Sequence, residues 1–244
     1  MPPGPYTTEE LTAVVIARRV RDGENVGIGV NSPIPAAGVL LARRLHAPRV
    51  RLRMPGFAGS VPFLGSKEFF DFAQRGRLDL FFLSGVQIDA HANINLHLLG
   101  DHERPRRRFP GAFGSSVLYY VAKRVILFQT EHTQRSFPRR VDFVTASGET
   151  EAGLRRPGGP DRVVTPLAVL VYNRKAGKLE LESYHPGQSM ASVTAATGFE
   201  LEPSVGVHQT PAPSEQELAV LRGEVYAEMA SAYPAFVERM ATLA

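Results

Sequence analysis

A run of apolar residues that ends in a polar loop constrains the fold of this chain more than any other feature. Residues Leu78 to Ser84 are almost continuously apolar, which is typical of a strand buried on both faces of a parallel sheet. The loop behind this run carries the polar side chains Gln87, Asp89, His91, Asn93 and Asn95. Open α/β sheets bind their ligands in loops at the carboxyl ends of strands. We therefore expect a site in this loop, although each polar residue taken singly is also a common turn former.

Strands alternate with helices along the chain. The expected helices are one opened by the capping box Thr7–Glu10, then Pro33–His46, Ser66–Arg75, Ser115–Lys123, and a C-terminal helical region that Ser214 and Glu217 cap and Pro234 interrupts. The expected strands are Asn25–Val30, Val50–Met54, Leu78–Ser84, Val125–Phe128, Val141–Thr145, Val163–Tyr172 and Lys178–Tyr184. This alternation predicts an α/β fold with an open, mostly parallel sheet flanked by helices. We interpret residues 1–244 as a single domain, in which Gly148 to Pro160 is a long surface loop.

The composition excludes several classes of protein. The 244 residues contain no cysteine, so the chain has no disulfide, no thiol nucleophile and no thiolate metal site. No apolar run is long enough to span a bilayer, and the first ten residues lack the layout of a signal peptide. We therefore expect a cytoplasmic protein without a membrane partner.

The basic charge does not predict a nucleic-acid groove. The net charge is +4, and the arginines come in short, scattered clusters with acidic residues between most of them and no interleaved aromatic residues. Most of these clusters are therefore expected to be solvated surface. Three histidines lie close together in sequence, His91, His97 and His102, but their spacing matches no zinc motif, so we predict no metal site.

Four segments carry a resemblance to a known family. They are His46–Val50 (HAPRV), Ser84–Ser116, Asp161–Tyr172 and Leu181–Leu201. In this order they resemble the β-subunits of family I CoA-transferases, with the β-subunit of glutaconate CoA-transferase as the model, and they are also similar to the β-subunits of steroid-ring-degrading CoA-thioester hydrolases. The resemblance implies a β-subunit that pairs with a homologous α-subunit, with the active site at their interface. It also implies an acyl-CoA substrate and no cofactor beyond the coenzyme A of that substrate.

The resemblance further implies which residues bind CoA or substrate. The family's QID-x-x-G-N-x-N loop near the acyl-CoA site is matched by Gln87, Asp89, Asn93 and Asn95, with Ala92 in place of the usual glycine. Its glycine-rich G-x-G-G turn is matched by Gly111, Ala112, Phe113 and Gly114. Backbone N–H groups of such a turn could approach a thioester oxygen or the pantetheine. Phe113 stands where glycine is common, which narrows the pocket or changes the direction of the amides.

The carboxylate that a family I transferase needs is missing from this chain. In the family, a glutamate just after the strand that follows the HAP motif attacks the thioester and then carries CoA. The matching stretch, Arg53 to Gly59, has Met54-Pro55 in its place, and no acidic residue lies between Glu24 and Glu68. Neither methionine nor proline can form an acyl anhydride, so we assign no catalytic residue to this chain.

Three functions remain open at this point. The chain is the β-subunit of a CoA-transferase-like enzyme whose α-subunit provides the nucleophile. Alternatively, it is the β-subunit of a hydrolase that opens a ring of a cyclic CoA thioester, with the catalytic glutamate on the α-subunit. A third interpretation is a non-catalytic scaffold subunit. Two further histidines, His132 in Glu131-His132 and His185 in His185-Pro186-Gly187, are more simply explained as structural than as acid/base groups.

Overall fold

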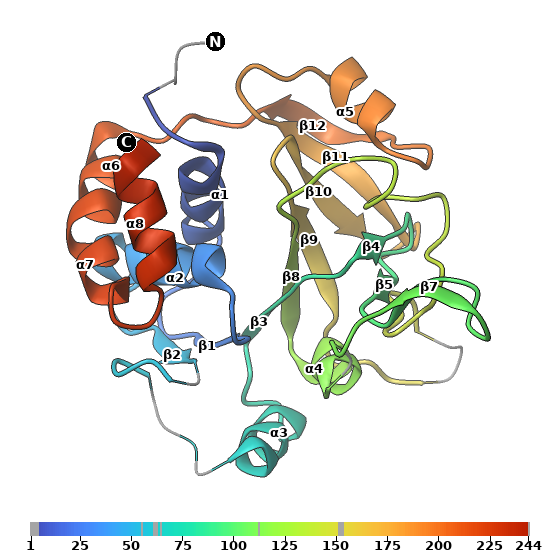
Figure 1. The fold of residues 1–244 in the computed structure, drawn as a ribbon, viewed down its shortest axis with the longest axis horizontal. Coiled ribbons are helices and arrows are strands. Elements are labelled where there is room, and N and C mark those ends of the chain that lie inside the picture. Colours follow the sequence, from blue (N-terminus) through green and yellow to red (C-terminus); the bar gives the residue numbers. More distant parts are fainter. Residues whose placement is uncertain are drawn as a thin grey trace. The chain divides into compact units, whose positions relative to one another are not determined.

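A computed structural model describes residues 5–54, 56–60, 63, 65–111, 113–150 and 154–243 (Figure 1). The chain divides into two compact units, one of Met1–Leu64 with Ala212–Ala244 and the other of Gly65–Pro211. This division does not test the interpretation of residues 1–244 as one domain, which stays a prediction. In the part of the chain that the structure describes, no helix combines the length and the apolar character needed to cross a bilayer.

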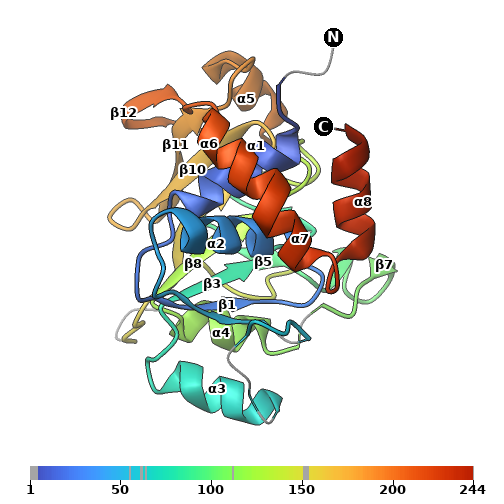
Figure 2. The ribbon, with the colours of Figure 1, turned by 90° about the vertical axis from the view of Figure 1, so that its left-hand side faces the viewer.

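The first unit packs helices beside two parallel strands. Its strands are β1 (Asn25–Ile28) and β2 (Arg51–Arg53), and its helices are α1 (Thr8–Ala17), α2 (Pro33–Leu45), α6 (Glu215–Val220), the π-helical turn η1 (Leu221–Val225), α7 (Tyr226–Met229) and α8 (Pro234–Leu243). Figure 2 shows α1 and α2 beside the helices of the C-terminal segment, and α2 contacts both α6 and η1. Both capping boxes expected from the sequence are present, at Thr7 and at Ser214. Pro234 begins α8, because a proline lacks the N–H that the interior of a helix needs and is tolerated at its start.

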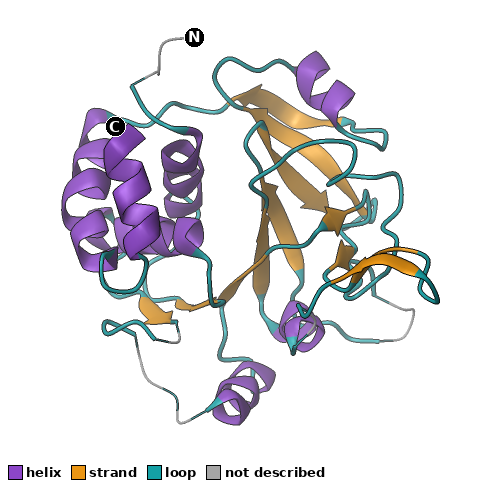
Figure 3. Ribbon diagram, in the orientation of Figure 1, coloured by secondary structure: helices purple, strands orange, loops and turns teal. Residues whose placement is uncertain are grey.

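The second unit is built on strands in the order β12-β11-β10-β9-β8-β3 (Figure 3). The strands are β3 (Leu80–Leu83), β8 (Arg124–Phe128), β9 (Pro160–Val164), β10 (Ala168–Asn173), β11 (Lys178–Tyr184) and β12 (Pro203–Gln209), accompanied by α3 (Ser66–Gln74), α4 (Ser115–Val121) and α5 (Met190–Ala196). The pairs β3–β8, β8–β9 and β11–β12 are parallel, whereas β9–β10 and β10–β11 are antiparallel. With β1–β2, parallel pairs predominate, as the sequence predicted.

Two expectations about strands need correction. The predicted strand Val141–Thr145 is wrong: this segment is irregular, and only Ala146 forms an isolated bridge, to Ile94. Because β8 already has β3 and β9 as neighbours, no open edge beside it is left for another strand. The apolar run Val163–Tyr172 is two antiparallel strands, β9 and β10, because the Thr165 hydroxyl accepts the N–H groups of Leu167 and Ala168 and closes a turn.

The polar loop after β3 contains two small hairpins of its own. The first pairs β4 (Gln87–Ile88) with β5 (Ile94–Asn95), and the second pairs β6 (Leu98–Gly100) with β7 (Pro105–Arg108). Both belong to the second unit and both follow the carboxyl end of β3. The sequence correctly predicted where this loop begins, but not that it is folded into hairpins.

Candidate functional site

The hairpin β4–β5 carries the four polar residues that the sequence indicates as ligands. The side chains of Gln87, Asp89 and Asn95 are buried, and that of Asn93 is half-buried. A buried polar side chain needs hydrogen-bond partners, and the partners of these four decide whether they can also reach a ligand.

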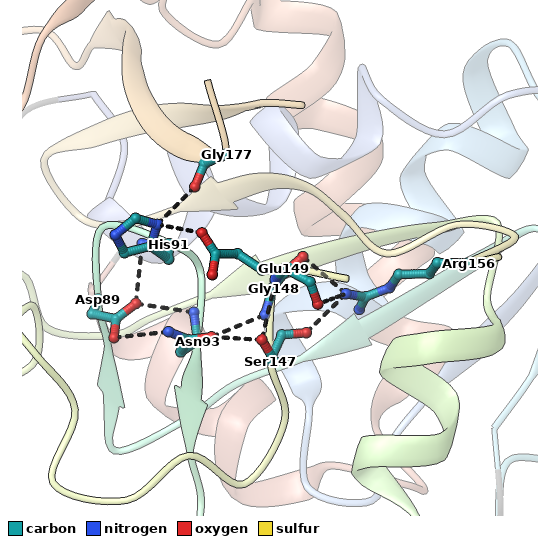
Figure 4. A network of polar contacts seen from close by, with 8 residues as sticks. All are labelled: Asp89, His91, Asn93, Ser147, Gly148, Glu149, Arg156 and Gly177. Carbon is teal, nitrogen blue, oxygen red and sulfur yellow. Dashed lines mark hydrogen bonds and ion pairs between the residues drawn. The ribbon is translucent and has the colours of Figure 1, made fainter. Parts of the chain in front are cut away.

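Asp89 forms the turn of this hairpin. Its Oδ1 accepts the backbone N–H groups of His91 and Asn93 at 3.0 and 3.1 Å, and its Oδ2 accepts the Asn93 side-chain amide at 3.1 Å. Figure 4 shows the carboxylate directed at these donors within its own loop. Asp89 is therefore an Asx-turn acceptor in this structure, the simpler of the two roles considered for it.

Asn93 connects the hairpin to the segment of residues 147–149. Its Oδ1 accepts the Ser147 hydroxyl at 3.0 Å and the Gly148 N–H at 3.1 Å (Figure 4). A β-carbon on Gly148 would lie 2.0 Å from the His91 carbonyl oxygen, so only glycine permits this close approach. Residues 147–149 are thus held against the hairpin by side-chain and backbone contacts together.

Arg156 holds the same segment from its other side. Its Nη1 donates to the carbonyl oxygens of Ser147 and Gly148, both at 2.8 Å (Figure 4). Its Nη2 donates to the Tyr119 carbonyl at 2.7 Å. The guanidinium also lies 4.9 Å from the centre of the Tyr119 ring. Arg156 is therefore an exception to the expectation that the arginine clusters are solvated surface. No sequence pattern indicates its role, because its partners are carbonyl groups, which every residue has.

Gln87 and Asn95 join the base of the hairpin β4–β5 to the start of β6 and to Asp142. The Asn95 amide donates to Gln87 Oε1 at 2.8 Å and to the Leu98 carbonyl at 2.6 Å, and its Oδ1 accepts the His97 N–H at 3.0 Å. Gln87 Oε1 also accepts the N–H of Asp142 at 2.8 Å. Both side chains thus bond to the protein itself, and their contribution to any site is to hold the loop in shape.

The glycine turn lies at the start of α4. Gly114 has a φ of +54°, and a β-carbon there would lie 2.1 Å from the Phe70 ring, so packing requires this glycine as well as its backbone conformation. Phe113 is 75% exposed, and its ring lies 5.7 Å from that of Phe70. A β-carbon on Gly111 would lie 3.1 Å from the Leu96 carbonyl oxygen. Ala112 lies outside the described residues.

Met54, which the resemblance predicts at the position of the family's glutamate, is a buried residue. Met54 follows β2 and is 3% exposed, and its N–H donates to the Ser60 hydroxyl at 2.7 Å. Its sulfur accepts the Tyr233 hydroxyl at 3.3 Å. Burial raises the pKa of Tyr233, so the phenol stays protonated and remains a donor. Pro55 lies outside the described residues.

His132 and His185 are buried in one threonine-rich network. His132 Nδ1 and Nε2 lie 2.8 and 3.0 Å from the hydroxyls of Thr165 and Thr197. His185 Nε2 donates to the Thr165 carbonyl at 2.9 Å, so its Nδ1 accepts the Thr210 hydroxyl at 2.9 Å. Burial lowers the pKa of each imidazole to about 4, so both are neutral at pH 7.

This network gives the two histidines a structural role. Every ring nitrogen is already engaged inside the fold, and Glu131 is bound to Arg135 and Thr133 rather than to His132. A general acid or base needs a nitrogen that can reach a substrate. Across the described ranges, no three His, Cys, Asp or Glu side chains are grouped so that they could hold a metal ion.

The family model described as Coenzyme A transferase matches residues 57–196. Similar proteins include the B subunit of 3-oxoadipate CoA-transferase from Pseudomonas knackmussii, 31% identical over 89% of this chain and 92% of the relative. The B subunit of glutaconate CoA-transferase from Acidaminococcus fermentans is 27% identical over 90% and 92%. The cholesterol ring-cleaving hydrolase IpdB subunit of Rhodococcus jostii is 28% identical over 88% and 91%.

Solved structures agree with these relatives. The chain matches glutaconate coenzyme A-transferase from Acidaminococcus fermentans with a TM-score of 0.81 and 26% identity, covering 93% of this chain and 98% of that one. It matches the decarboxylase AibA/AibB with a TM-score of 0.77 and 26% identity, covering 91% and 98%. These likenesses confirm the predicted fold class and the resemblance read from the four segments.

Proposed function

Since the chain belongs to the Coenzyme A transferase family, we propose that it is the β-type subunit of a heteromeric enzyme that acts on acyl-CoA thioesters and contributes no covalent nucleophile of its own. The observation that carries this proposal is the buried Met54 after β2. A thioether cannot attack a thioester to form an acyl anhydride and cannot then carry CoA. With no acidic residue between Glu24 and Glu68, no neighbour in sequence takes its place.

The contacts of Met54 support this interpretation. Its sulfur receives the Tyr233 hydroxyl and its backbone is fixed by Ser60, so the position is filled by a packed side chain. A nucleophile would need the opposite arrangement, with room for a thioester beside it and donors directed at the developing oxyanion. The subunit therefore acts as scaffold and pocket wall around chemistry that its partner performs.

The partner that we propose is a homologous α-type chain. Three relatives are named as subunits, two of them as B subunits, and the decarboxylase AibA/AibB is a complex of two chains. The attacking or proton-transferring carboxylate would come from that chain. The only cofactor that the proposal requires is the coenzyme A carried by the substrate.

Hydrolysis with CoA retained is the reaction that needs least from this chain. Water can open a ring or cleave a carbon–carbon bond of the acyl group while the thioester stays intact, so no CoA has to be carried on Met54. The ring-cleaving hydrolase relative is consistent with this reaction. CoA transfer through a nucleophile on the partner is the second candidate, and the relative from 3-oxoadipate CoA-transferase favours it.

Within this function, the loops after β3 would shape the acyl-CoA pocket. The proposed CoA or substrate site comprises Gln87, Asp89, Asn93, Asn95, Gly111, Ala112, Phe113 and Gly114. Because the four polar side chains bond to the protein, we assign them a positioning role. The exposed Phe113 ring and the backbone N–H groups of its turn are the parts that would touch the ligand.

The test is to purify this chain together with its α-type partner and to incubate the complex with a panel of acyl-CoAs, with and without acceptor acids. Mass spectrometry of every CoA species then identifies the reaction. A product equal to substrate plus one water, with CoA still attached, is expected. CoA on the acceptor, with none bound to this chain, would establish the second candidate. Absence of turnover by a stable complex would reject both and leave a scaffold.

A further inference from the structure

The hairpin β6–β7 carries a row of exposed arginines. Arg106, Arg107 and Arg108 are consecutive on β7. All three are exposed, and the Arg106 side chain is 80% exposed. Arg106 lies 3.9 Å from the Asp142 carboxylate. Arg107 lies over the Phe109 ring at 4.9 Å, and Arg108 donates to the His102 carbonyl. The row therefore keeps most of its positive charge.

The acidic residues of the hairpin have partners other than this row. Asp101 accepts the N–H groups of Glu103 and Arg104 and so closes the turn between the two strands. Glu103 lies 3.2 Å from His102 Nδ1. Neither carboxylate neutralises the arginines of β7, so an anionic ligand would meet little competition there.

Aromatic rings lie beside the arginines. The rings of His97 and His102 are 5.0 and 5.6 Å from that of Phe143, and the planes of His102 and Phe143 are inclined by only 18°. The three rings form a partly exposed cluster next to the hairpin, in which the rings of His102 and Phe143 are stacked. A planar base could extend such a stack, because every base has an aromatic face.

Gln87 and Asn95 hold this surface in place. Asn95 bonds to the backbone of His97 and Leu98, where β6 begins. Gln87 Oε1 accepts the N–H of Asp142, whose carboxylate accepts the Gly100 N–H at 2.7 Å. The loop that resembles the family's CoA motif is thus the support on which the hairpin is built.

We propose that the hairpin β6–β7 binds the phosphorylated adenosine end of CoA. The guanidinium groups of Arg106 and Arg107 pair with its phosphates, and the stack that includes His102 and Phe143 receives the adenine. The proposal rests on the proposed function, because it assumes that the substrate is a CoA thioester. Gln87 and Asn95 are then positioning residues, since they act on the ligand through the hairpin.

Binding of CoA and of dephospho-CoA to the purified complex, measured by calorimetry, tests the assignment. The test variant is Arg106→Gln/Arg107→Gln, and the matched control is Arg75→Gln/Arg77→Gln, two exposed arginines between α3 and β3. The complex should bind CoA about ten-fold more tightly than dephospho-CoA. The test variant should lose most of this difference and bind CoA about ten-fold more weakly, while the control keeps both.

Competition identifies the ligand that the surface prefers. Adenosine 3′,5′-bisphosphate should displace CoA from the complex, and inorganic pyrophosphate should do so far less well. Three results would each overturn the assignment. The two compounds could compete equally well, the test variant could keep the CoA affinity of the wild-type complex, or the test variant could lose the α-type partner instead of CoA. Turnover is measured separately. If the complex is inactive but still binds CoA more tightly than dephospho-CoA, the proposed function is rejected and the binding surface is supported.

Discussion

The substitution Asn95→Asp tests most sharply whether the predicted ligand loop is structural. Asn95 is fully buried, and its amide nitrogen donates to Gln87 Oε1 and to the Leu98 carbonyl at 2.8 and 2.6 Å. Aspartate has the same shape, but a carboxylate oxygen replaces the amide nitrogen and then faces two hydrogen-bond acceptors. Rotating the Gln87 amide relieves one contact and turns an N–H₂ group toward the Asp142 N–H instead.

The magnitude can be worked from these contacts. Two lost hydrogen bonds remove about 2 kcal/mol, and an uncompensated buried carboxylate brings the total to about 4 kcal/mol of unfolding free energy. Burial raises the pKa of such a carboxyl, and its protonated form can donate one of the lost bonds. The destabilisation relative to the wild-type protein should therefore be smaller at pH 5 than at pH 8.

Urea unfolding of both proteins at matched pH measures this difference, and the slope of the transition shows whether the unfolded state has changed. Asn31→Asp is the control, because Asn31 is exposed and aspartate tolerates its φ of +59°, so a change within about 0.5 kcal/mol is expected. An Asn95→Asp protein within about 1 kcal/mol of wild type at pH 8 would refute the structural role and return Asn95 to the set of possible ligand groups.

Three further predictions concern other parts of the chain. Met54→Glu should not create CoA-transferase activity in the complex, because a carboxylate there lacks room for a thioester and donors for the oxyanion. Met54→Gln is the isosteric control, and CoA transfer by the Glu variant would contradict the prediction. Gly114→Ala should lower the unfolding free energy by about 2 kcal/mol, because its β-carbon meets the Phe70 ring at a positive φ, and Phe70→Leu in the same chain should restore part of the loss. His132 and His185 have pKa values near 4 in the folded protein and near 6.5 when unfolded, so the unfolded chain binds more protons between these values. The free energy of unfolding should therefore be highest above pH 6.5 and fall by about 3 kcal/mol per imidazole toward pH 4. If the free energy of unfolding of a His185→Gln chain depends on pH as steeply as that of the wild-type chain, the assignment is wrong.

Local signals in the sequence predicted much of the fold. Capping boxes located the starts of two helices, and the turn Asn173 to Gly177 predicted the hairpin β10–β11, because these signals depend on residues three to five apart. The strand predicted at Val141–Thr145 failed because strand formation depends on an available neighbour, which no local pattern encodes.

The candidate site was predictable in its location but not in its contacts. The polar string after β3 identified the loop, yet its side chains bond to partners distant in sequence, such as Asp142 and Gly148. The same holds for Tyr233, which contacts Met54 from 179 residues away. Contacts of this kind arise from tertiary packing, so a sequence pattern can indicate which residues matter without revealing whether they bind a ligand or the fold.

The intact mass of this chain, measured after the complex has been incubated with an acyl-CoA substrate and quenched, tests the central claim most directly. We predict an unmodified chain while the substrate is consumed, because a methionine cannot carry CoA and we propose that Met54 replaces the family's nucleophile. A gain in the mass of this chain equal to covalently bound CoA would contradict the account, provided that hydroxylamine releases the CoA, as it does from an acyl thioester. That result would place the nucleophile on this subunit.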